Sequence, residues 1–60
     1  MKKKKFKEYE IEIEYRSIFV SREFTHSSGE AAAQARKELN KKVDDAVITQ
    51  VTVTKIRDLG

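Results

Sequence analysis

The sequence predicts an α+β fold, a two-layer ββαβ domain in which one helix packs on one face of a three-stranded sheet. Two patterns indicate this fold. Within residues 6–15, apolar and charged side chains alternate from Glu8 onward, which is the two-residue period of a strand with one buried face. Ser27 and Glu30 have the spacing of a capping box directly before an alanine-rich segment, which marks the start of a helix.

The first strand separates its side chains by charge. The odd-numbered positions are apolar and are expected to face the helix: Tyr9, Ile11, Ile13 and Tyr15. The even-numbered positions are carboxylates and are expected to face water: Glu8, Glu10, Glu12 and Glu14. Because side chains alternate between the two faces of a strand, the four carboxylates form one row on the face away from the helix.

A tight two-residue turn at residues 16–17 is expected to lead into a second strand at residues 18–25. Such a turn places three apolar side chains of this strand on the core face: Ile18, Val20 and Phe24. Phe19 then lies on the outer face beside the glutamates. Arg22 falls on the core face, where either its stem follows the core edge or a bulge turns it outward.

The helix is expected to begin after Ser27 and to end at about Lys42, and the third strand is expected over residues 47–57. The helix has one stripe of small and apolar residues: Ala32, Ala35, Leu39 and Val43. In the third strand, Val51 and Val53 are expected to face inward. We expect the strand order 2-1-3 with all pairs antiparallel, since a right-handed crossover permits it. Order 1-2-3, with one parallel pair, is the alternative.

Composition limits both the stability and the chemistry of the chain. A domain of 60 residues buries only about 60% of the surface that its unfolded chain exposes, so a second chain is one source of further apolar contacts. The chain has no cysteine and one histidine, which excludes disulfides and zinc sites built from Cys and His. His26 has no cysteine, glycine-rich loop or oriented aspartate beside it. We therefore expect no enzyme activity, no catalytic residue, no metal, no cofactor and no small-molecule substrate.

The basic residues are concentrated at the N-terminus: Lys2, Lys3, Lys4, Lys5 and Lys7. The formal net charge is +3, but residues 8–60 hold ten Asp and Glu against eight Lys and Arg. We expect a flexible basic tail at residues 1–5 before a slightly acidic single domain at residues 6–58. The tail favours nucleic-acid binding as the alternative function, with an affinity that falls steeply with salt and is lost when the tail is deleted.

Hydropathy argues against a membrane partner. No apolar stretch is long enough to span a bilayer, and no apolar run follows the basic N-terminus as it does in a secretory signal. Together with the absence of cysteine, this favours a cytoplasmic protein.

The row of carboxylates favours protein binding as the function. We interpret the chain as a small module that modulates or inhibits a larger protein with a basic surface. Its expected contact residues are Glu8, Glu10, Glu12, Glu14 and Phe19, with Phe19 as the apolar anchor. Open strand edges are also compatible with a homodimer. A solvated face that keeps the small sheet soluble is the alternative explanation of the glutamates.

The chain is similar in general character to short accessory proteins of phages and mobile elements, because it is small and has neither cysteine nor a catalytic motif. This similarity assigns no role to any residue.

Overall fold

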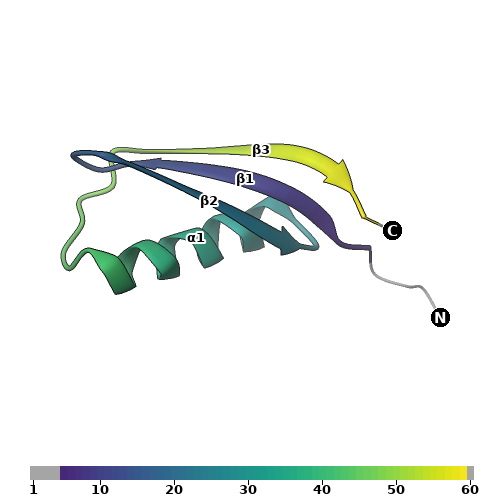
Figure 1. Cartoon of the computed structure of the whole chain (residues 1–60), viewed down its shortest axis with the longest axis horizontal. Helices are drawn as coiled ribbons and strands as arrows, with labels where there is room; N and C mark the ends of the chain where they lie inside the picture. Colours follow the sequence, from purple (N-terminus) through teal and green to yellow (C-terminus); the bar gives the residue numbers. More distant parts are fainter. Residues whose placement is uncertain (1–4, 60) are drawn as a thin grey trace.

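The computed structural model describes residues 5–59 and has the element order β1-β2-α1-β3 (Figure 1). The elements are β1 (Lys7–Glu14), β2 (Ile18–Thr25), α1 (Ser28–Lys42) and β3 (Gln50–Asp58). The sheet has the order β2-β1-β3 with both pairs antiparallel, and α1 lies along one of its faces (Figure 1). The predicted ββαβ fold and strand order 2-1-3 are confirmed.

The core lies between α1 and the central strand β1. It consists of six buried residues, which are Tyr9, Ile11, Ile13, Ala31, Ala35 and Leu39. The two alanines have short side chains, so the helix lies close to the sheet and Leu39 supplies most of its buried volume. Val51 and Val53 of β3 pack against this core as predicted. The buried stripe of α1 differs by one position from the prediction, because Ala31 is fully buried and Ala32 only half-buried.

The start of α1 is fixed by the predicted cap. The Ser27 hydroxyl accepts a hydrogen bond from the Glu30 amide at 3.3 Å. The Glu30 carboxylate accepts one from the His26 amide at 3.1 Å, one residue before the amide that a standard capping box uses. Two amides near the helix start are thereby satisfied by side chains.

The structure places the side chains of β2 on faces opposite to those predicted. Glu14 pairs with Ile18, so the hairpin loop has three residues rather than two. A two-residue loop would have paired Tyr15 with Ile18. Because neighbouring residues of a strand point to opposite faces, this difference of one residue reverses the whole strand.

The reversal corrects four predicted positions. The side chains expected in the core lie on the outer face and are more than half exposed: Ile18 (57%), Val20 (53%) and Phe24 (56%). Phe19, expected on the outer face, packs against the core instead. Arg22 points outward because of the register and not because of a bulge.

The one break in register lies between β1 and β3. Glu8 pairs with Arg57 and Tyr9 with Lys55, so Ile56 is an extra residue in β3. β3 begins at Gln50 rather than at residue 47, and Ile48 packs against the core from the loop that precedes the strand.

Within residues 5–59, the structure contains one helix, and it is neither long nor apolar enough to cross a membrane.

We expect Leu39→Ala to lower the free energy of unfolding by about 2–5 kcal/mol, because Leu39 is fully buried and its loss leaves a cavity under the sheet. Urea unfolding followed by circular dichroism measures the change. Val47→Ala is the control, because Val47 is 75% exposed and its truncation should change stability by less than about 0.5 kcal/mol. Equal effects of the two substitutions would contradict the assignment of the core.

Candidate functional site

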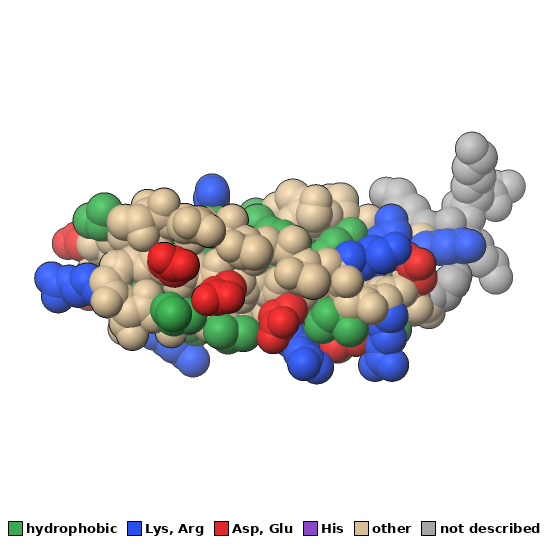
Figure 2. All heavy atoms as spheres, turned by 90° about the horizontal axis from the view of Figure 1, so that it is seen from above, with side chains coloured by type: hydrophobic (Ala, Val, Ile, Leu, Met, Phe, Trp, Pro, Cys, Tyr) green, Lys and Arg blue, Asp and Glu red, His purple; other side chains and the backbone are tan. Residues whose placement is uncertain are grey.

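The sheet face opposite α1, which we call the outer face, carries three parallel rows of side chains. β2 contributes Ile18, Val20, Arg22 and Phe24; β1 contributes Glu14, Glu12, Glu10 and Glu8; β3 contributes Gln50, Thr52, Thr54 and Arg57. In the part of the chain that the structure describes, no helix or strand covers this face. Figure 2 shows the molecule from above, with carboxylates following one another along it, hydrophobic side chains beside them and basic side chains toward both ends.

Glu8 is not part of the surface available to a partner. It is only 3% exposed, although it lies on the outer face. Nε of Arg57 donates a hydrogen bond to one carboxylate oxygen at 2.7 Å, and Nη1 of Arg22 donates to the other at 3.4 Å. The arginines come from the two flanking strands, so the carboxylate links all three strands at this end of the sheet. The row of four predicted contact residues is thereby reduced to three.

Glu10, Glu12 and Glu14, which we call the acidic row, keep their charges directed outward. Glu10 and Glu12 are half-buried between the neighbouring strands, and Glu14 is exposed. Among the described residues, none of the three takes part in an ion pair. The acidic row therefore presents three negative charges that are close to one another, while the arginine pair gives the Glu8 end an excess of positive charge.

Ile18, Val20 and Phe24, which we call the apolar row, lie on the outer face of β2. Ile18 and Val20 flank the acidic row, whereas Phe24 pairs with Glu8 and Arg22 lies between Val20 and Phe24. Val20 pairs directly with Glu12, and Ile18 with Glu14. The sequence prediction missed this row because it placed these side chains in the core. The signal that could have revealed it is Arg22, since a charged residue of the same parity as an expected core row indicates that the row faces water.

Phe19 is not available as the predicted apolar anchor. It lies on the helix side of the sheet, and Nζ of Lys42 is 5.5 Å from the centre of its ring. This distance is within the range of a cation–π contact, so Phe19 helps to hold the end of α1 against β2.

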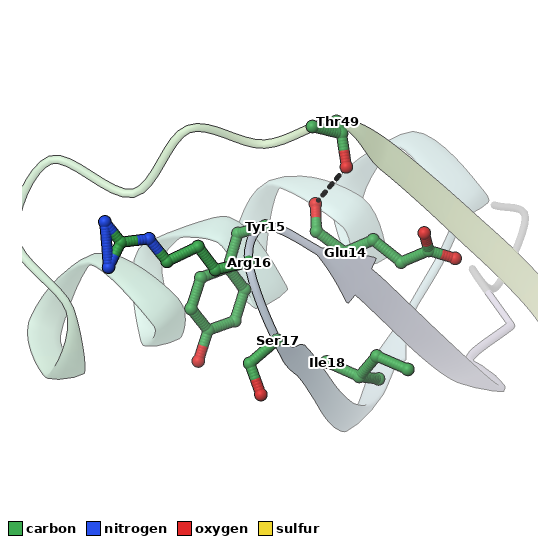
Figure 3. A pocket seen from close by; sticks show the side chains of 6 residues that line it. All are labelled: Glu14, Tyr15, Arg16, Ser17, Ile18 and Thr49. Carbon is green, nitrogen blue, oxygen red and sulfur yellow. Dashed lines mark hydrogen bonds between the residues drawn. The ribbon is translucent and has the colours of Figure 1, made fainter.

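A hollow of about 570 Å³ lies at the tip of the β1-β2 hairpin. Figure 3 shows that the Glu14 carboxylate and the Arg16 guanidinium extend in opposite directions from it. The Thr49 hydroxyl donates a hydrogen bond to the backbone oxygen of Glu14 at 3.1 Å, which ties the hairpin to the chain before β3 (Figure 3). Catalysis requires polar groups that converge on one point, and the polar groups of this hollow do not do so.

A second hollow, of about 210 Å³, lies at the start of α1 and is lined in part by Phe6, Phe24 and His26. The rings of Phe6 and His26 are stacked with their centres 4.2 Å apart. Nδ1 of His26 is 3.1 Å from the backbone oxygen of Lys5. These contacts hold the start of β1 against the helix cap and give His26 a structural role.

The remaining predicted features lie apart from the outer face. Lys2, Lys3 and Lys4 are outside the described residues. Lys5 is exposed before β1, and Lys7 is half-buried at the beginning of that strand. Over residues 5–59, no group of three His, Cys, Asp or Glu side chains is arranged to hold a metal ion.

Comparison with known proteins finds no family model, no curated protein and no solved structure that matches this chain. Functional inference therefore depends on the geometry of the described residues.

We expect Arg57→Met to lower the free energy of unfolding by about 1.5–3 kcal/mol, the usual worth of a hydrogen bond to a charged group, because it leaves the buried Glu8 carboxylate without its shorter bond. Arg22→Met should lower the free energy of unfolding by less, since the hydrogen bond from Arg22 to Glu8 is longer. Thermal and urea unfolding measure both. Lys55→Met is the control, because Lys55 pairs with an exposed aspartate and such pairs contribute little. A control effect as large as that of Arg57→Met would refute the role of Glu8.

Proposed function

We propose that this protein is a small, non-catalytic binding module that docks through its outer face on a larger protein with a basic surface. The observation that carries the proposal is the apolar row beside the acidic row. Ile18, Val20 and Phe24 are each more than half exposed. Exposed apolar side chains that are grouped, rather than scattered singly, are typical of interaction sites.

A face that served solubility alone would not need this arrangement. The acidic row would keep the sheet soluble with polar residues on both neighbouring strands, and β3 carries such residues at Gln50, Thr52 and Thr54. β2 carries apolar side chains, Ile18 and Val20, opposite Glu14 and Glu12, and Arg22 opposite Glu10. Burying the exposed part of each apolar side chain against a partner would contribute about half of the 1.5–3 kcal/mol that full burial of such a side chain is worth, which supports binding as the reason for their exposure.

The proposed contact residues differ from those expected from the sequence. The apolar row replaces Phe19 as the anchor, and the acidic row supplies the charge without Glu8. The unpaired edge of β2 lies directly beside the apolar row and extends the contact surface. We assign the module to the cytoplasm, as a modulator or inhibitor of its partner, on the basis of its small size and cysteine-free sequence.

We expect Glu12→Lys and Val20→Ser each to weaken capture of the partner by about tenfold or more, because single interface residues commonly contribute above 1.4 kcal/mol. The immobilised protein is incubated with nuclease-treated extract of its source cells, and retained proteins are quantified by mass spectrometry. Asp44→Lys and Val47→Ser are matched controls at exposed loop positions and should leave capture unchanged. If no retained protein distinguishes the outer-face variants from their controls, the proposal is wrong.

A further inference from the structure

The acidic and apolar rows lie on adjacent strands of one sheet face and differ in chemistry. They belong to neighbouring strands, which places them about 4.8 Å apart. From Ile18 to Phe24 the apolar row is about 20 Å long at the usual rise of a strand. The two rows overlap where Ile18 and Val20 pair with Glu14 and Glu12, and Arg22 lies between Val20 and Phe24. A partner that satisfies both rows must therefore present an apolar stripe beside a cationic flank at this overlap and reach past Arg22 to contact Phe24.

An α-helix has the shape that meets this requirement. With side chains it is about 10 Å wide, so it covers two adjacent rows of a sheet. Residues three and four apart share one stripe, and the neighbouring stripe is free to carry Lys or Arg. At 1.5 Å per residue, a helix of about 14 residues matches the length of the apolar row.

The other face of the same sheet already packs against a helix. α1 contacts the sheet through Ala31, Ala35 and Leu39, which are four residues apart along one stripe. A second helix on the outer face would complete a three-layer arrangement with helices on both faces of the sheet. On the helix side, the sheet thus packs a helix through a single stripe of side chains four residues apart.

A second copy of this chain fits the outer face poorly. β1 is the central strand, so stacking two outer faces would bring one acidic row against the other, and like charges in an interface are costly. A copy that added a strand at the β2 edge would leave the acidic row uncovered. Nucleic acid and anionic lipid are disfavoured because their phosphates would face the same carboxylates.

We propose that the outer face binds an amphipathic helix of about 14 residues in the partner protein, a length set by the rise of an α-helix. Its apolar stripe covers Ile18, Val20 and Phe24, and a flank of Lys or Arg side chains lies over the acidic row. This inference rests on the proposed function, because it specifies which element of the partner the outer face contacts.

The test is a selection of random 16-residue peptides displayed against the full chain, with peptides that also bind Val20→Ser or Glu12→Lys removed. Selected peptides are synthesised, and their affinity is measured by calorimetry and their helicity by circular dichroism. We expect apolar residues at three- and four-residue spacing with Lys or Arg on one flank, and an increase in helicity on binding. Glu10→Lys, which is not used in the selection, should weaken binding about tenfold and Asp44→Lys should not, since one close charge pair commonly contributes about 1.5 kcal/mol or more.

The alternative outcomes separate this inference from the proposed function. Selected peptides in which apolar and polar residues alternate, and which bind the β2 edge as an added strand, would overturn the inference of a helical partner. The proposed function would still stand. Sedimentation showing a homodimer that dissociates on Val20→Ser would also overturn it, because a second copy would occupy the apolar row. If no peptide distinguishes the protein from its outer-face variants, or if only an RNA probe binds, both proposals are wrong.

Discussion

The pairing of Glu14 with Ile18 across the β1-β2 hairpin is the constraint on which the rest of the structure depends. It gives the loop three residues and thereby decides which face every side chain of β2 occupies. It brings Phe19 against the core and places Arg22 on the same face as Glu8. The exposed apolar row is a direct consequence of this register and not a separate feature.

The energies of the two registers explain why the exposed row is tolerated. The predicted register would bury the exposed part of three apolar side chains, which is worth about half of the 1.5–3 kcal/mol of full burial for each. It would also turn the Arg22 guanidinium toward the core, where it would have no partner. A buried charge that loses its partner costs about 3–5 kcal/mol. In the observed register, Arg22 and Arg57 both bond to the Glu8 carboxylate, so no charge is left buried and unpaired. The free energy saved by keeping the Arg22 charge out of the core therefore offsets much of the burial that Ile18, Val20 and Phe24 give up.

The parts of the fold that the sequence predicts correctly are those determined by local pattern. β1 alternates from Glu8 to Glu14 and α1 has a side-chain cap, so these elements follow from the residues themselves. The strand order is not local, and the sequence leaves order 1-2-3 open beside order 2-1-3. The faces of β2 do not follow from local pattern either, because they depend on a loop length that no glycine or Asn-Gly pair specifies. The same distinction applies to the candidate site. The two-residue alternation of β1 predicts the face of the glutamates, whereas the apolar row is missed because the predicted hairpin register is wrong. Glu8 shows a further limit, because its burial depends on two arginines that are distant in sequence.

If the outer face binds a partner as proposed, the alternation of β2 separates the residues of folding from those of binding, because one face of the strand meets the core and the other the partner. Side chains on the helix side of the sheet form the core, and those of the apolar and acidic rows contact it little, so the outer face can change without loss of the fold. The exception is Glu8 with its arginines, which lies toward one end of the rows, where Arg22 separates Phe24 from Val20. A partner helix on the rows would bind only the folded sheet, so its binding would add stability by mass action to a protein with a core on one side only. The exposed row thus costs the free protein stability that the complex would recover.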